Sequence, residues 1–141
     1  MKAVGYSQTA LAKKLGIKEG SVIRIVNAPA HYFDLFTDFP ENVHISEEVN
    51  EKKHLVHLFV YTEIDLHHYI PDIKKQIHLN GSIWVSWPKK ASKVATDVTK
   101  DVVRKAAFQN GLVDIKVCAV DEQWSGLKLV IHVKDRKSSI E

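Results

Sequence analysis

A short lysine-rich segment, residues 87–93, carries the side chains best suited to binding an anion. Its candidate ligand-binding residues are Trp87, Lys89, Lys90, Ser92 and Lys93. Lysine ammonium groups bind phosphate and carboxylate groups, and the start of a helix predicted from Thr96 would attract the same groups. The segment therefore predicts an anion-binding edge. The alternative is a solvated loop whose lysines pair with Asp121, and Asp97 and Asp101 would weaken an anion site at the helix start.

A second group of candidates, Asp121, Glu122 and Trp124, lies in a polar turn between the last two apolar runs of the chain. Two carboxyl groups near lysines could exchange protons with a substrate, whereas a salt-bridged surface turn needs no chemical role. The sequence has neither a G-x-S-x-G nucleophile elbow nor a phosphate-binding glycine loop, so we predict no catalytic residue. We expect these three residues to contribute to binding at the same edge as the lysines.

Eight histidines raise the question of a metal site. His54 and His57 are three apart in or beside a predicted strand, so their side chains should point to opposite faces. His67 and His68 are adjacent on a predicted helix and diverge by about 100° around its axis. Neither pair can chelate a metal locally. The sequence therefore predicts no metal site, and only tertiary assembly could create one.

Residues 7–27 resemble a helix-turn-helix, which would make this a DNA-binding protein. In that interpretation LAKKLG forms the first helix and a recognition helix starts at Glu19. The segment 22–26, VIRIV, argues against it because β-branched residues favour a strand over an exposed helix. A formal net charge of +3 is also far from the concentrated basic surface of a committed nucleic-acid binder. DNA binding is kept as an alternative, and we expect no nucleic-acid partner.

The composition is that of an ordinary globular domain, with 45% hydrophobic and 26% charged residues in a chain of 141. No run approaches the ~20 apolar residues that span a bilayer, and the N-terminus lacks a signal peptide. We therefore expect no membrane association and a cytoplasmic location. Cys118 is the only cysteine, which excludes an internal disulfide, and its apolar neighbours predict a small buried side chain.

Hydrophobic periodicity predicts strands that alternate with helices. Strands are expected at residues 22–26, 43–46, 55–61, 82–87, 113–120 and 127–133. Helices are expected at residues 8–15, 30–36, 62–77 and 96–110. Pro71 should kink the third helix or start a second one, and Asn80 and Gly81 predict a turn. Trp84 and Trp87 should point to opposite faces of their strand.

Alternating strands and helices favour a parallel sheet with right-handed crossovers. We therefore predict an α/β, Rossmann-like fold with an open, mostly parallel, doubly wound sheet of about six strands, the last two forming an antiparallel hairpin. A single domain should span residues 1–141. Within it we expect an N-terminal helical arm at 1–20, the α/β core at 21–134 and a polar tail at 135–141.

From Val22 onward, the order of elements resembles the class I S-adenosylmethionine-dependent methyltransferase fold, and LNGSIWVSWPK looks like its fifth strand. The resemblance implies S-adenosylmethionine as a cofactor. In that family the first strand carries an acid and ends in a GxGxG loop, which lets the backbone approach the cofactor. Here residues 25–31 contain neither, and Pro29 cannot donate an N–H. Asn27 in this loop, and Glu47, which could stand where the family binds ribose hydroxyls, are the remaining candidates.

The chain also resembles a family of short bacterial proteins of unknown function built around a WPKK-x-S segment. The matching segments are GYSQTALAKKLGIKEG, SWPKKASKVATDVTKDVVR and VDIKVCAVDEQWSGLKLVI. This likeness covers nearly the whole chain. It supports the fold and implies no activity.

The sequence alone does not name a reaction. We predict a non-catalytic binding or regulatory module with an anion-favouring edge at residues 89–93 and no bound cofactor. Its partner should be an anionic small molecule or a protein. An atypical S-adenosylmethionine-dependent methyltransferase and a helix-turn-helix DNA-binding protein are the alternatives. The pattern indicates no particular oligomeric state.

Overall fold

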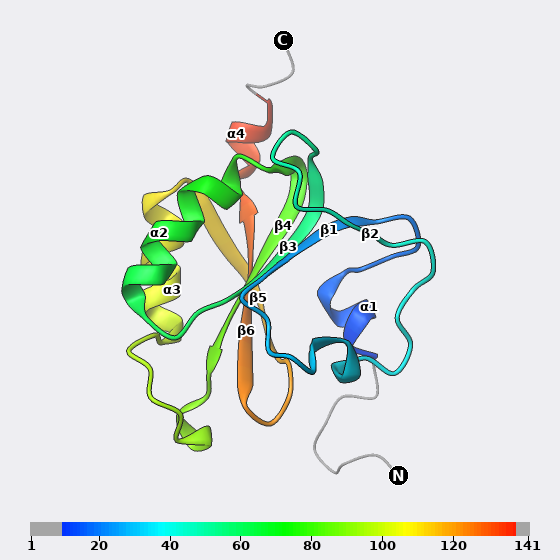
Figure 1. Cartoon of the computed structure of the whole chain (residues 1–141). Coiled ribbons are helices and arrows are strands. Elements are labelled where there is room, and N and C mark those ends of the chain that lie inside the picture. The colour runs from blue at the N-terminus through cyan, green and yellow to red at the C-terminus, as the bar shows by residue number, and fades with distance from the viewer. Residues whose placement is uncertain (1–9, 138–141) are drawn as a thin grey trace.

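The computed structural model describes residues 10–137, which form a six-stranded mixed sheet with helices on both faces (Figure 1). The strands are β1 Val22–Val26, β2 His44–Ile45, β3 Lys53–Phe59, β4 Ile77–Pro88, β5 Leu112–Ala119 and β6 Trp124–Ile131. The helices are α1 Leu11–Leu15, α2 Glu63–Lys74, α3 Lys100–Gln109, α4 Val133–Lys137 and the 3₁₀ helices η1 Tyr32–Leu35 and η2 Lys90–Ser92. Among the described residues, no helix has the length and apolar character needed to cross a membrane.

The strands lie in the order β2-β1-β3-β4-β6-β5. β2, β1, β3 and β4 run parallel, while β6 pairs antiparallel with β4 and with the edge strand β5. The carboxyl ends of the parallel strands therefore share one edge of the sheet with the β5–β6 turn. We call this the carboxyl edge and the opposite one the amino edge. The predicted fold class is confirmed.

The helix-turn-helix interpretation of residues 7–27 is wrong, because Val22–Val26 is strand β1 and lies between β2 and β3. Ile23 and Val26 are buried on opposite faces of the sheet. These β-branched side chains therefore stabilise a strand here rather than an exposed helix. α1 covers only the end of the predicted first helix and stops at Gly16, whose φ of 92° favours glycine. Residues 7–9 of that prediction lie outside the described residues.

Each face of the sheet carries its own core. α2 and α3 cover one face, where Leu58, Ile83 and Leu127 are fully buried. α1 and η1 cover the other, which we call the α1 face, and there the Trp84 indole N–H donates to the Leu15 carbonyl over 2.8 Å. Trp87 belongs to the α2/α3 core, so the two tryptophans of β4 point to opposite faces as predicted.

α2 is a single helix with Pro71 inside it, and the predicted second helix is absent from this segment. The Thr62 hydroxyl accepts from the Asp65 N–H over 3.1 Å and so caps the start of the helix. Leu66, Ile70 and Ile73 are buried on its inner face, so packing holds the helix together past the proline.

The predicted turn at Asn80 and Gly81 is wrong, because both residues lie within β4. The pairing of β4 with β3 shifts here: Lys53 faces Ile77, while Leu55 faces Ser82. The extra residues form a bulge on β4. A Cβ on Gly81 would lie 3.1 Å from each of three backbone carbonyl oxygens, those of Lys53, His54 and His78, so the bulge favours glycine and a larger residue would have to shift backbone.

Two further predictions need correction. The helix expected at 30–36 is the short 3₁₀ helix η1. The polar tail at 135–141 stays a prediction, since its first residues lie in α4 and residues 138–141 lie outside the described part. Cys118 is partly buried, because β5 is an edge strand.

A buried lysine organises the amino edge. The Lys53 side chain has no solvent exposure, and its ammonium group donates to the Glu48 carbonyl and to Gln76 Oε1, the latter over 3.2 Å. Arg24 Nη1 donates to the same Gln76 oxygen over 3.0 Å. These bonds satisfy charged groups that would otherwise be costly to bury. They also fix the chain after β2 against the beginning of β3.

Candidate functional site

The carboxyl edge brings together the two turns that the sequence singles out. The Lys89 N–H donates to the Gln123 carbonyl over 2.7 Å, and Pro88 faces Trp124 in the β4–β6 register. The loop after β1 joins them, since His31 Nε2 lies 3.8 Å from Asp121 Oδ2. Topology accounts for this meeting, because parallel strands end at the same edge and the β5–β6 turn opens there.

The lysine loop, residues 89–93, is a compact turn around η2. Ser92 stabilises it from within: its hydroxyl donates to the Lys89 carbonyl over 2.6 Å and accepts from the Val94 N–H over 3.3 Å. Lys93 closes the turn with φ of 62°. Ser92 therefore shapes the loop, and the groups left for a ligand are the lysine ammonium groups.

The lysines of this loop are not paired with the neighbouring acids. Among the described residues, no ion pair joins Lys89, Lys90 or Lys93 to a carboxylate. Asp121 is engaged in its own turn, where Oδ1 accepts from the N–H groups of Gln123 and Trp124 over 2.8 and 2.7 Å. The salt-bridged alternative to an anion-binding loop is therefore not what the structure shows.

The helix that follows the loop begins later than predicted. α3 starts at Lys100, where the Thr99 hydroxyl accepts from the Val102 N–H over 3.2 Å. Thr96 donates to the Tyr61 carbonyl over 2.6 Å. Asp97 accepts from the Glu63 N–H over 2.7 Å at the start of α2. The predicted anion site at a helix beginning at Thr96 is therefore wrong, since that segment caps and anchors α2 instead.

Asn27 supplies the backbone geometry of the loop after β1. It is exposed and has φ of 60°, in the left-handed region where asparagine is tolerated best after glycine. The chain then turns at Pro29, whose carbonyl accepts from the Tyr32 N–H over 3.0 Å. Asn27 thus adopts the backbone conformation of the turn, and it carries a side chain where a glycine would leave room for a ligand.

Glu47 does not join the other candidates. The Ser46 N–H donates to the Ile23 carbonyl over 2.8 Å, so Glu47 lies beside the middle of β1 rather than beyond its end. Its neighbour Glu48 accepts from Lys53 at the start of β3. β2 has only two residues and cannot carry Glu47 to the carboxyl edge. The expected place beside a ribose is therefore wrong for this side chain.

The two tryptophan candidates are core residues. Trp87 is 7% exposed and Trp124 is 1% exposed, so neither ring offers a surface to a ligand. Trp124 Nε1 is nevertheless buried without a hydrogen-bond partner in the described chain. Tyr61, which the sequence analysis did not single out, is 43% exposed and its ring centroid lies 5.4 Å from that of Trp124.

The sequence analysis also did not predict a buried chain of hydrogen bonds on the α1 face. The Tyr32 hydroxyl lies 3.0 Å from His57 Nδ1, and His57 Nε2 lies 2.8 Å from Ser86 Oγ. Burial lowers the pKa of His57 to about 3, so the ring is neutral at physiological pH. A neutral imidazole donates once and accepts once, which matches its two hydroxyl partners. No sequence signal reveals this chain, because its members are 25 and 29 residues apart.

The histidines do not assemble into a metal site. His54 accepts from the Val22 N–H over 2.9 Å at the surface, while His57 is buried. Within residues 10–137 no group of three or more histidine, cysteine or acidic side chains is placed to hold a metal ion.

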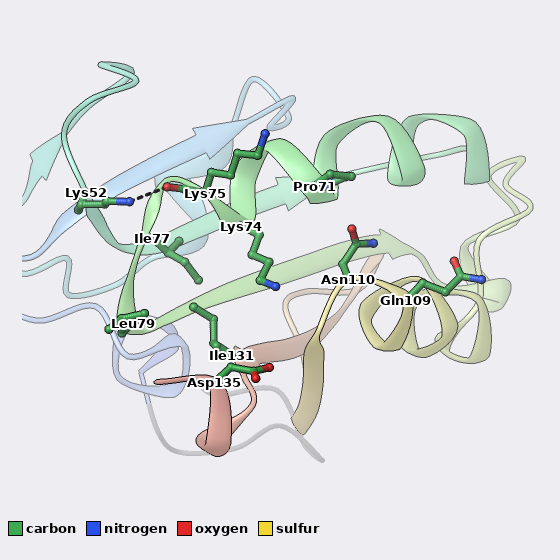
Figure 2. A pocket seen from close by; sticks show the side chains of 10 residues that line it. All are labelled: Lys52, Pro71, Lys74, Lys75, Ile77, Leu79, Gln109, Asn110, Ile131 and Asp135. Atoms are coloured by element: carbon green, nitrogen blue, oxygen red, sulfur yellow. Dashed lines mark hydrogen bonds between the residues drawn. The ribbon is translucent and has the colours of Figure 1, made fainter. Parts of the chain in front are cut away.

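A hollow of about 640 Å³ lies at the amino edge, away from the predicted site (Figure 2). Its lining includes Lys52, Lys74 and Lys75. The ends of α2 and α3 meet here, and the carbonyl groups at a helix end attract cations. Figure 2 shows one such contact, in which Lys52 Nζ donates to the Lys75 carbonyl over 2.7 Å. Lys52 therefore has a local structural role at the end of α2.

A parallel sheet in this order, flanked by helices and closed by an antiparallel hairpin, is a Rossmann-like fold of the class I methyltransferase type. The chain belongs to the family described as "Protein of unknown function (DUF3052)", whose model matches residues 12–133. No curated protein matches the sequence.

Solved structures with this fold include three methyltransferases. The precorrin-6y C5,15-methyltransferase of Geobacter metallireducens GS-15 has a TM-score of 0.58 at 9% identity, covering 94% of each chain. The ribosomal protein L11 methylase of Lactobacillus delbrueckii subsp. bulgaricus has 0.57 at 10% identity, covering 86% of this chain and 75% of that one. The magnesium protoporphyrin IX methyltransferase of Synechocystis PCC 6803, with bound SAM, has 0.56 at 9% identity, covering 86% and 74%. At these identities the likeness shows the fold alone.

The residues at the carboxyl edge do not match the methyltransferase cofactor site. The loop after β1 has Asn27 and Pro29 in place of glycines, and Glu47 lies away from the edge. A Pro nitrogen offers no hydrogen bond, and side chains fill the space that a glycine loop leaves open. The shared fold therefore comes without the glycine loop that the resemblance implies after the first strand.

Proposed function

We propose that this protein is a non-catalytic binding module that takes an anionic group at the lysine loop of its carboxyl edge. The observation that carries the proposal is the set of three lysines, Lys89, Lys90 and Lys93, with no carboxylate partner among the described residues. Lys90 and Lys93 are exposed, and Lys89 is half-buried. An arriving phosphate or carboxylate would therefore meet cations that no internal acid neutralises.

The surroundings of the loop support the same conclusion. Open α/β sheets bind ligands at the carboxyl ends of their strands, and β4 delivers the lysine loop to that edge. The lysine loop is held in place by Ser92 and by the Lys89–Gln123 backbone bond. Its backbone would therefore lose little conformational freedom when a ligand binds.

Calorimetry with inorganic phosphate, ADP and a hexose phosphate tests the proposal. We expect binding that weakens about tenfold in Lys89→Ala/Lys90→Ala, because two of the three cations are removed. The matched control is Lys100→Ala/Lys105→Ala, which removes two exposed lysines from α3 and should bind like the wild type.

Three outcomes would contradict the proposal. The first is that no tested anion binds the wild-type chain, and the second is that both double variants bind equally. The third is a rise of the melting temperature with S-adenosylmethionine, because a ligand that binds only the folded state stabilises it. That rise would favour the atypical methyltransferase, for which the fold is the supporting observation.

A further inference from the structure

β5 is the last strand in the order of the sheet, so it is an edge strand: β6 pairs with its inner side, and no described strand pairs with its outer side. An edge strand presents a row of backbone N–H and C=O groups that can pair with another extended chain. β5 has eight residues, long enough for a full strand to pair with it. Its three middle residues, Ile115, Lys116 and Val117, are all exposed.

Lysines gather where β5 borders the α1 face. Lys116 faces Lys128 across the β5–β6 pair, and a Cβ on Gly16 would lie 3.9 Å from Lys128 Nζ, so the end of α1 lies close by. Burial lowers the pKa of Lys128, and the charges of Lys116 and Lys18 lower it further. Burial raises the pKa of the Cys118 thiol, and the charges of Lys14, Lys116 and Lys89 oppose that rise, so Lys14 also lies near β5. We call Lys14, Lys18, Lys116 and Lys128 the basic strip.

The basic strip has no internal counterion. Among the described residues, none of its four lysines lies in an ion pair with a carboxylate. Like charges directly opposite each other on neighbouring strands are destabilising, and Lys116 and Lys128 are such a pair. An anionic partner would relieve this repulsion.

The other face of β5 exposes apolar surface. Val117 faces Leu127, a residue of the α2/α3 core, and yet it is 53% exposed. Ile115, at the irregularity between Asp114 and Lys116, is 56% exposed. β5 therefore offers a cation on one face and an apolar side chain on the other, and no described strand pairs with the outer side of its backbone.

We propose that β5 is a docking strand for an extended segment of a partner protein in which acidic and apolar residues alternate. The segment would pair with the outer backbone groups of β5, place its carboxylates over the basic strip and lay its apolar side chains beside Val117. This goes beyond anion binding at the lysine loop, because it rests on a strand edge and on other lysines.

Charge and shape select this partner over two others. A second copy of β5 would bring Lys116 against Lys116, and the like charges oppose that pairing. A nucleic acid would match the charge of the basic strip, but its phosphate backbone has no N–H donors for the C=O groups of β5 and gains nothing from exposed Val117 and Ile115.

Fluorescence anisotropy with a labelled peptide of about ten residues, alternating glutamate and valine, tests the proposal on the full chain. We expect binding that Lys116→Glu weakens at least about tenfold, because it reverses the central charge. Lys105→Glu makes the same change at an exposed site on α3 and should bind like the wild type. A peptide alternating lysine and valine should not bind.

A second peptide separates strand pairing from simple charge attraction. N-methylation of alternate residues of the glutamate–valine peptide leaves its charge intact and blocks its backbone hydrogen bonds, so binding should be lost. Hydrogen exchange should also slow at the β5 amides when the unmodified peptide binds. Equal binding of the methylated peptide, equal binding of a single-stranded DNA of the same charge, or a dimer that Lys116→Glu strengthens would each overturn the proposal.

Discussion

The two faces of the sheet bury side chains of different kinds. Under α2 and α3 the buried cluster is built from aliphatic side chains and the Trp87 ring. Under α1 and η1, the structure buries His57, Ser86 and Tyr32 in one hydrogen-bonded chain, and it ties Trp84 to the backbone of α1. The basic strip and the loop after β1 border this second face.

The difference teaches that the two faces constrain the chain differently. An apolar core requires volume and shape, and it tolerates substitutions that keep both. A buried polar chain requires each partner, because a donor or acceptor left alone costs its desolvation. Both faces bury apolar side chains, but the α1 face in addition fixes one arrangement of the segments that border the candidate surfaces. Three measurements can break or sharpen this contrast.

The largest effect should come from Ile83→Ala on the α2/α3 face. Ile83 is fully buried in β4, so its truncation removes buried methyl groups and leaves a cavity. We expect a loss of about 2–5 kcal/mol in the free energy of unfolding, measured by urea denaturation. Ile64→Ala, at a side chain 79% exposed on α2, is the control and should change stability by less than about 0.5 kcal/mol. Similar losses in the two variants would show that the burial of Ile83 does not stabilise the α2/α3 face.

The second effect is a pH dependence that belongs to the α1 face. His57 has a pKa of about 3 in the folded protein, against 6.5 in the unfolded chain. Between these values the unfolded chain binds a proton that the folded one does not, so stability should fall as the pH drops below 6.5, by up to about 1.4 kcal/mol per pH unit from this group.

His57→Phe should remove this part of the slope, although it also lowers stability at neutral pH by leaving the Tyr32 and Ser86 hydroxyls without their partner. His68→Phe changes an exposed histidine and should keep the wild-type slope. Denaturation curves collected from pH 7 to pH 4 compare the three proteins. If all three slopes coincide, His57 does not set the acid sensitivity of this face.

The smallest effect concerns how α3 begins. Thr99→Ala removes the hydroxyl that accepts from the Val102 N–H, which should cost about 1 kcal/mol in thermal or urea unfolding. Thr99→Ser keeps a capping hydroxyl and should restore most of the stability. Equal stability of the alanine and serine variants would show that tertiary packing alone sets the start of α3.

Much of the fold could be predicted because local patterns and topology agree. The β-branched run at Val22–Val26 indicates a strand, and the alternation of strands and helices predicts a parallel sheet. Together these placed the lysine loop and the turn at Asp121 on one edge, where the Lys89–Gln123 bond now joins them. Adjacency at an edge follows from strand direction, and direction is readable from connection lengths.

What could not be predicted depends on contacts between distant residues. Asp97 and Thr96 resemble the start of a helix, but their side chains bond to Glu63 and Tyr61, so α3 starts later. Glu47 does not lie at the carboxyl edge, because β2 ends after two residues. The partners of His57 lie in a 3₁₀ helix and in another strand. No local window of sequence contains these pairings.

The bulge at Gly81 has a consequence for how this sequence can vary. Its missing side chain lets two strands bring three carbonyl oxygens around one carbon atom, and any larger residue would have to push backbone apart rather than rotate a neighbour. Selection can exchange the residues beside it and refit their side chains. A side chain at position 81 cannot be accommodated by refitting neighbouring side chains, because its contacts are with backbone. Across homologous chains we therefore expect glycine here even where the lysine loop has diverged.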